Sequence, residues 1–124
     1  MMETSKYYFR AWDGKRMIYF NLMMDGLTDD MKYHIRMGDW PVMQFTGRQD
    51  ILKAPIFNLD IVNVNHPYDV TKDFKNTLAV VFYDENDARY LHAGISNGRP
   101  PKAMWEYVQI VGNAYQNPEM LRRK

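Results

Sequence analysis

The chain has 124 residues, with 16 Lys and Arg against 15 Asp and Glu, so its net charge is +1. This length favours one domain over residues 1–124, large enough for a core without disulfides, and the charge gives no general attraction to a polyanion. The absence of cysteine excludes disulfides, thiolate metal sites and a cysteine nucleophile. With no apolar leader and no apolar stretch of about 20 residues, we expect a cytoplasmic protein.

The aromatic and methionine content is high. The chain has nine tyrosines, three tryptophans and ten methionines. These residue types are enriched in the cores of protein interfaces, and they also fill irregular gaps inside small β domains. The composition therefore fits both an ordinary core and a protein-binding surface, and we favour the ordinary core.

The first predicted element is a β-hairpin around Asp13-Gly14. This pair favours a two-residue type I′ turn, which would place Trp12 opposite Lys15 and Tyr8 opposite Tyr19. Strand alternation then gives one face of core type and a second face that is both aromatic and cationic. The first face carries Tyr7, Phe9, Ala11, Ile18 and Phe20. The second carries Tyr8, Arg10, Trp12, Lys15, Met17 and Tyr19, and it would be a second core, an interface or a binding surface.

Two structures compete for the segment that follows the hairpin. Thr28-Asp29-Asp30 would cap a helix, on which Leu27, Met31 and Ile35 lie at helical spacing. Residues 32–37, however, alternate strictly, as a strand does, and Gly38-Asp39 would turn them into a strand over residues 40–45 that Thr46-Gly47 ends. We favour the strand, with room for one helical turn before it, and with Pro41 at a sheet edge.

The rest of the chain is dominated by strand signals. Strands are expected over residues 60–64, 78–83, 88–93 and 105–111, with the most apolar of them, 78–83, at the centre of a sheet. Residues 65–69, 84–87 and 94–102 read as turns and loops, and Asn117-Pro118-Glu119 begins a short helix that ends in basic residues 122–124. About seven strands predict a mainly β, compact antiparallel domain, barrel- or sandwich-like, with a short C-terminal helix.

Four ordered stretches resemble the YopX family of small bacteriophage and prophage proteins. Residues 9–17, 42–47, 60–62 and 111–121 follow the order of the family phrases F-R-A-W-D, M-Q-Y-T-G-L-K-D, Y-E-G-D-I-V and I-G-N-I-Y-E-N-P-E-L-L. The resemblance implies a mainly β fold and a phage origin, hence the cytoplasm of a bacterial host, and it implies no activity. Where the family has an Asn-Gly-Lys turn and a Gly before the Asp, this chain has Leu52-Lys53-Ala54 and Leu59, so a tight turn there has no support from the sequence.

No residue pattern predicts catalysis, a metal site or a cofactor. Residues 94–98 fit G-x-S-x-G, a motif that requires a helix directly after it and a histidine later in the chain. Here Arg99-Pro100-Pro101 prevents the helix, and no histidine follows. His34, His66 and His92 lack the spacing of metal ligands. The acidic stretch 84–87 reads as a solvated turn. We therefore expect a protein that is not an enzyme.

The sequence predicts a protein that acts by binding. The leading hypothesis is a protein-interaction or self-associating accessory factor, most simply a homodimer, with no membrane partner. The alternative is a small nucleic-acid-binding β module with aromatic side chains as a stacking platform. The candidate binding residues are Tyr8, Arg10, Trp12, Lys15 and Tyr19. The side chain of Trp12 would either be exposed on an open platform or be packed inside the fold or a subunit interface. We favour packing.

Overall fold

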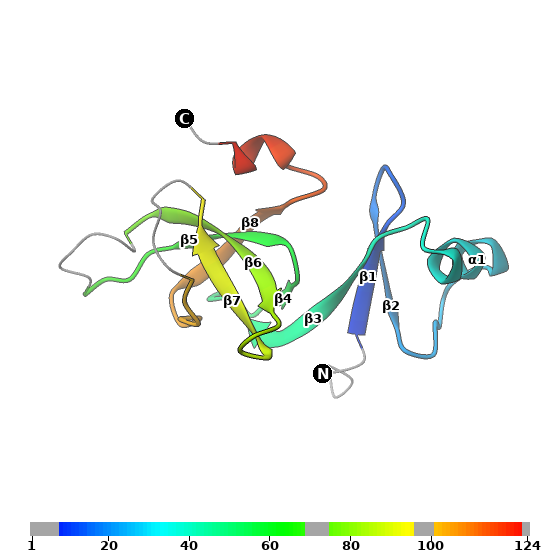
Figure 1. Ribbon diagram of the computed structural model, residues 1–124, viewed down its shortest axis with the longest axis horizontal. Helices are drawn as coiled ribbons and strands as arrows, with labels where there is room; N and C mark the ends of the chain where they lie inside the picture. Colours follow the sequence, from blue (N-terminus) through cyan, green and yellow to red (C-terminus); the bar gives the residue numbers. More distant parts are fainter. Residues whose placement is uncertain (1–7, 69–74, 96–100, 123–124) are drawn as a thin grey trace.

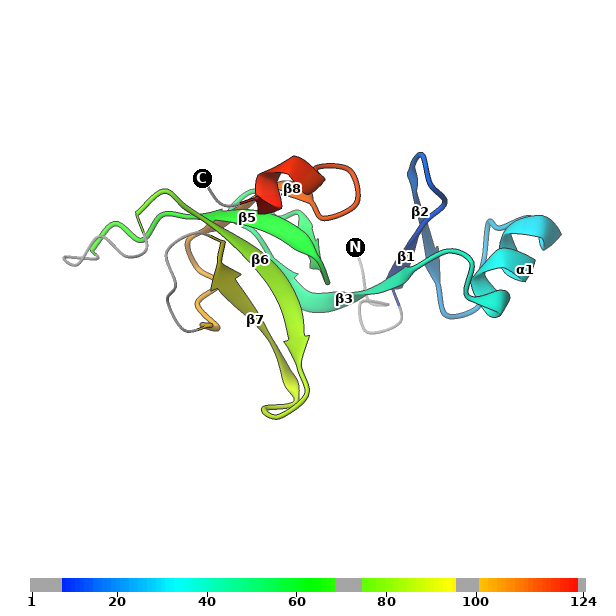
Figure 2. The ribbon, with the colours of Figure 1, turned by 45° about the horizontal axis from the view of Figure 1, so that its top comes forward.

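The fold is mainly β and sandwich-like, as the sequence predicts. The computed structural model describes residues 8–68, 75–95 and 101–122. The strands form two four-stranded antiparallel sheets, with the orders β2-β1-β3-β4 and β7-β6-β5-β8. The sheets do not close into a barrel; the long strand β3 runs from the hairpin at one end of the molecule towards the second sheet at the other (Figures 1 and 2). No helix in the described ranges is long and apolar enough to span a bilayer.

The first hairpin forms, but its predicted register is wrong. Strand β1 (Tyr8–Trp12) pairs with β2 (Met17–Asn21) so that Trp12 lies opposite Met17, two positions away from the predicted Lys15. Asp13 closes a four-residue loop, because its Oδ1 accepts hydrogen bonds from the amides of Lys15 and Arg16 at 2.8 and 2.9 Å. Only Gly14 of the Asp13-Gly14 pair has a positive φ, +103°, so the turn is not type I′. A shift of two residues keeps each side chain on its predicted face.

The predicted strand over residues 32–37 is wrong, since these residues belong to helix α1 (Asp29–Met37). The amide of Met31 donates to the Thr28 hydroxyl at 3.2 Å, and Gly38 ends the helix in the left-handed conformation with φ +80°. The helix lies beyond the hairpin, on the side away from the second sheet (Figures 1 and 2). The two capping residues decide the structure, and the alternating pattern does not.

Strand β3 (Val42–Gln49) does not end at Thr46-Gly47 as expected. Gly47 takes φ +88° inside the strand, and the register with β4 (Pro55–Phe57) shifts between Phe45 and Gln49, so the glycine marks an irregularity and not a terminus. Pro41 precedes β3 next to the part of β3, residues 42–44, that pairs with β1, whereas the pairing with β4 begins at Phe45, so one side of the chain is open at the proline.

A tight turn joins β3 to β4, where the residue types alone do not indicate one. The amide of Lys53 donates to the Asp50 carbonyl at 2.9 Å, and Lys53 itself has φ +71°. Leu59, the other residue where the family has glycine, has φ +69°. Both residues therefore adopt the left-handed conformation without the glycine that it favours.

The second sheet is built from the four strands predicted after residue 60. Its strands are β5 (Asp60–Val64), β6 (Thr77–Asp84), β7 (Arg89–Gly94) and β8 (Val108–Asn113), and β6 lies inside the sheet as predicted. Strand β8 begins later than expected, because Trp105 packs into the core from the preceding loop. The terminal element is a short 3-10 helix, Pro118–Leu121. The main core cluster contains Ile56, Val62, Val64, Ala79, Val81, Trp105 and Val108.

Candidate functional site

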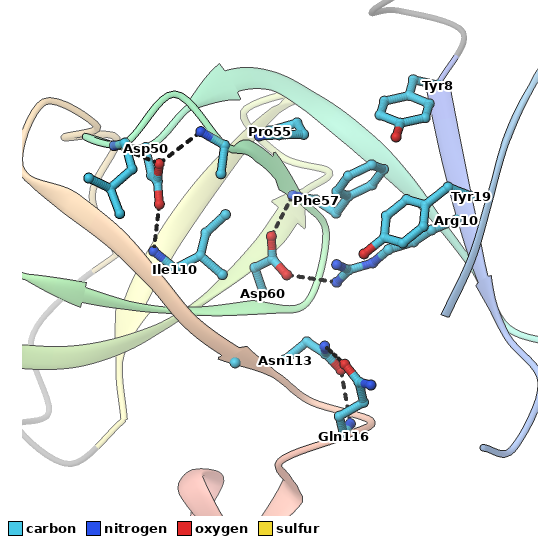
Figure 3. Close-up of a pocket in the computed structure, with 13 residues that line it drawn as sticks. Tyr8, Arg10, Tyr19, Asp50, Pro55, Phe57, Asp60, Ile110, Asn113 and Gln116 are labelled. Carbon is cyan, nitrogen blue, oxygen red and sulfur yellow. Dashed lines mark hydrogen bonds and ion pairs between the residues drawn. The ribbon is translucent and has the colours of Figure 1, made fainter. Parts of the chain in front are cut away.

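A pocket of about 570 Å³ opens where the first hairpin meets β4, β5 and β8 (Figure 3). One wall comes from the inner face of the hairpin, with Tyr8, Arg10 and Tyr19. The volume is in the range of ligand-binding pockets. The other lining residues are Asp50, Leu52, Ala54, Pro55, Phe57, Asp60, Ile110, Gly112, Asn113 and Gln116.

A buried ion pair forms the floor of this pocket. Nη2 of Arg10 lies 2.8 Å from Oδ1 of Asp60, and the two side chains are only 4% and 2% exposed. Oδ2 of Asp60 accepts a hydrogen bond from the amide of Phe57 at 2.7 Å. The guanidinium of Arg10 also donates to the Asn58 carbonyl at 3.2 Å and lies 4.8 Å from the centre of the Phe57 ring. The pair thus joins β1 of the first sheet to β5 of the second.

Burial changes the pKa of Asp60 in this ion pair. Desolvation raises the pKa of Asp60 to about 6, and it outweighs the charge of Arg10 and the hydrogen bond from Phe57, which both lower it. Asp60 is therefore ionised at neutral pH and takes up a proton in mildly acidic solution. Burial also raises the pKa of Tyr8, with a smaller contribution from Tyr19.

Two further polar residues of the pocket, Asp50 and Asn113, hold its walls in place by hydrogen bonds to the main chain. Oδ1 of Asp50 accepts hydrogen bonds from the amides of Leu52 and Ala54, both at 2.9 Å, and its Oδ2 accepts one from Ile110 at 3.0 Å. Asp50 thereby fixes the β3–β4 turn against β8. Asn113 organises the chain after β8 in the same way, since its Oδ1 accepts from the amides of residues 115 and 116. These groups position the pocket and leave little capacity for a ligand.

The structure brings together three of the five candidate binding residues. Tyr8 and Tyr19 pack around Phe57, with ring centres 5.2 and 5.4 Å away, and both line the pocket with Arg10. Trp12 lies outside the pocket, half-buried, and stacks on Tyr115 at 6.1 Å. Lys15 is exposed in the hairpin loop. The five residues therefore do not form one open aromatic and cationic platform.

Several residues of the pocket were missed by sequence reasoning. The candidate residues from the sequence do not include Asp50, Asp60, Asn113 or Gln116, and Leu52 is named there only as a departure from the YopX phrases. A signal was present, because three of the stretches that resemble the YopX family contain Arg10, Asp60 and Asn113. Stretches far apart in the sequence thus meet at one pocket, which the order of the phrases alone does not reveal.

No three His, Cys, Asp or Glu side chains gather as a potential metal site in the part of the chain that the structure describes. His92 is buried, and a ring nitrogen, Nε2, lies 2.9 Å from the Met104 carbonyl. Burial lowers the pKa of His92, so the ring is neutral and Nε2 donates this hydrogen bond. Ser96 of the G-x-S-x-G pattern lies outside the described residues.

Comparison with known proteins gives the family and the fold. The chain is similar to the crystal structure of protein EF1440 from Enterococcus faecalis, with a TM-score of 0.59 and 20% identity over 93% of this chain and 97% of that chain. No curated protein matches this chain. The family model described as YopX protein matches residues 8–122, nearly the whole chain. The chain therefore belongs to the YopX family.

Proposed function

We propose that this chain is an accessory protein of a bacteriophage or prophage that acts by binding a protein partner in the cytoplasm of a bacterial host. The observation that carries the proposal is the rim of the pocket. Tyr19 from β2 and Leu52 from the β3–β4 turn both line it, and they are 48% and 67% exposed. Exposed aromatic and aliphatic side chains around a pocket are typical of surfaces that receive an anchor residue from a partner.

The chemistry of the floor supports binding over catalysis. Arg10 and Asp60 neutralise each other, and the oxygens of Asp50 accept hydrogen bonds from the protein backbone. A general acid or base must be within hydrogen-bond reach of a substrate proton, and a nucleophile needs an adjacent base. A partner's side chain that enters the pocket makes apolar contacts at the rim, and the Arg10–Asp60 ion pair stays intact.

The same arrangement gives less support to nucleic-acid binding. A single strand is held by cations next to stacking platforms. The charge of Arg10 is compensated by Asp60, and Lys15 lies in the hairpin loop and does not line the pocket. The net charge of +1 adds no general attraction.

Photo-crosslinking in a bacterial host tests the proposal. A photoreactive phenylalanine analogue placed at Leu52, on the rim, should give a covalent protein adduct. The matched control places the same analogue at Tyr68, which is 80% exposed and does not line the pocket. Adducts at neither position, or equal adducts at both, would contradict a specific protein contact at this rim. Micromolar, salt-sensitive binding of a single-stranded oligonucleotide that Leu52→Glu abolishes would instead favour the nucleic-acid alternative.

A further inference from the structure

We infer that a second copy of this chain pairs with strand β2, so that the first sheets of two molecules become one continuous antiparallel sheet. The inference rests on the proposed protein-binding function and names both the partner and the surface. It is carried by the main-chain geometry of β2, by its composition and by the contrast with the other edge strands.

The main chain of β2 presents unpaired groups at the edge of its sheet. Strand β2 is the last strand in the order β2-β1-β3-β4. The amide of Asp13 donates to the carbonyl of Arg16 at 3.2 Å, so these two residues form a hydrogen-bonded pair. Because such pairs alternate along an antiparallel ladder, Ile18 and Phe20 bond to β1. The N–H and C=O groups of Met17 and Tyr19 therefore point outward, away from β1.

The composition of β2 lacks the usual protection of an edge strand. Its sequence Met17–Asn21 contains no charged residue, no proline and no glycine. Natural edge strands are protected by lysine, proline, bulges or a covering segment, because an open edge templates pairing with another chain. Leu22 and Met23 follow directly and are exposed, so they extend the apolar surface beyond the end of the strand.

The other edge strands of the described sheets are covered or short. In β7, the amide and the carbonyl of His92 both bond to Lys102, at 2.7 and 2.9 Å. In β8, the carbonyl of Val108 accepts from the amide of Ile51 at 3.0 Å. Strand β4 has three residues and begins with Pro55. The contrast singles out β2 as the edge that a partner strand fits.

A two-fold axis through the centre of β2 makes this edge complementary to itself. Tyr19 is the middle residue of five and has outward main-chain groups. Paired about the axis, Tyr19 and the partner's Tyr19 exchange two main-chain hydrogen bonds, and their side chains lie about 5.5 Å apart on one face of the sheet. That face is the one that lines the pocket. The second copy would thus place its own tyrosine beside the rim, which is an isologous contact of the commonest kind.

Charge substitution at the axis tests the inference by sedimentation equilibrium. The wild-type chain should be a dimer at tens of micromolar. Tyr19→Lys and Tyr19→Glu should each raise the dimer dissociation constant at least about tenfold, because like charges then lie directly opposite each other. An equal mixture of the two variants should recover the dimer, since only a contact of a residue with its own copy places Lys opposite Glu. Tyr83→Lys, at a strand tyrosine that is 46% exposed, is the matched control and should leave the dimer unchanged.

Circular dichroism of each variant checks folding, and Met23→Lys, at a side chain 77% exposed, provides charge repulsion at the end of the same edge if the Tyr19 variants fail to fold. A monomeric wild-type chain, or dimers unaffected by all three edge variants, would overturn the inference. If the wild-type chain is monomeric but Leu52 still crosslinks to another protein, the inference falls and the proposed function stands. If Leu52 gives no adduct at all, the proposed function itself falls.

Discussion

At the scale of single residues, the Arg10–Asp60 pair is a buried ionic contact that joins the hairpin to the second sheet. Two ions that are 4% and 2% exposed have lost their hydration, and the 2.8 Å contact between them restores only part of that loss. The hydrogen bonds to the Asn58 carbonyl and from the Phe57 amide restore a further part. Either ion alone in this position would be an uncompensated buried charge. Removing one of the two ions should therefore destabilise the protein by far more than the net contribution of the intact pair.

A double-mutant cycle measures this coupling. Arg10→Met and Asp60→Leu should each lower the free energy of unfolding by about 3–5 kcal/mol, because each leaves the other charge buried and unpaired. The double variant should lose less than the sum of the two single losses, by about 2 kcal/mol or more. Urea unfolding of the four proteins gives the required values. Additive losses would mean that the two side chains are not coupled.

The raised pKa of Asp60 predicts a defined pH dependence. The ordinary pKa of 3.8 rises to about 6 in the folded protein, so between these values the folded state holds a proton that the unfolded state has lost. The contribution of Asp60 to stability is fully present below pH 3.8 and is lost as pH rises to about 6, a change of about 3 kcal/mol.

Carbon-13 NMR of the Asp60 carboxyl should show a titration midpoint near pH 6, and a midpoint near 4 would contradict the prediction. This probe is needed because His92 acts in the opposite direction. Its lowered pKa gives a stabilisation that is present above pH 6.5 and is lost as pH falls. A bulk unfolding curve adds the two effects, whereas the carboxyl resonance reports Asp60 alone.

At the scale of elements, local hydrogen bonds decided the outcomes that periodicity left open. Strands β5, β6 and β7 were predictable because apolar runs between clear turn residues admit few alternatives. Helix α1 was mistaken for a strand because its apolar residues fit both periods, and the hydrogen bond to Thr28 favours the helix. The hairpin faces were predictable, but the side chain of Asp13 set the register. The partner of Arg10 was not predictable, since 50 residues separate it from Asp60.

The β3–β4 turn should be stabilised by a glycine. Lys53 is exposed and has φ +71°, which costs a side-chain-bearing residue about 1–2 kcal/mol. Lys53→Gly removes that strain and adds about 0.5–1 kcal/mol of backbone entropy cost, so a net gain of about 0.5 kcal/mol is expected. Lys15→Gly, at an exposed lysine without positive φ, is the control and should be destabilising. Thermal melts that rank these two variants in the reverse order would refute the strain argument.

The hairpin loop carries the opposite prediction. Gly14 has φ +103°, and a side chain there would meet no atom within 4 Å, so only backbone strain opposes a larger residue. Gly14→Val should lower the free energy of unfolding by about 1–2 kcal/mol. Lys15→Val in the same loop should change it by less than about 0.5 kcal/mol, as exposed substitutions usually do. Equal melting temperatures for the two variants would show that Gly14 is not held in this conformation.

At the scale of the whole molecule, contacts between the two ends decide whether the chain behaves as one domain. The hairpin and α1 lie at one end and the second sheet at the other, with β3 running between them (Figure 1). Three sets of contacts bind the inner face of the hairpin to the rest: the Arg10–Asp60 pair, the tyrosines around Phe57, and Trp12 on Tyr115. The second and third sets are aromatic, which gives large contact areas to a junction of few residues.

This junction predicts a single cooperative unfolding transition for residues 1–124. Trp12 and Trp40 report on the hairpin end, and Trp105 reports on the core beneath the second sheet. Single-tryptophan variants that keep Trp40 or Trp105, with Phe at the other two positions, should give coincident urea midpoints by fluorescence and by circular dichroism. Trp12→Ala should then lower the free energy of unfolding by about 2–3 kcal/mol, less than a fully buried tryptophan would cost, because Trp12 is half-buried on Tyr115. Separate midpoints for Trp40 and Trp105 would show that the ends unfold independently and that the junction, pocket included, is too weak to hold them together.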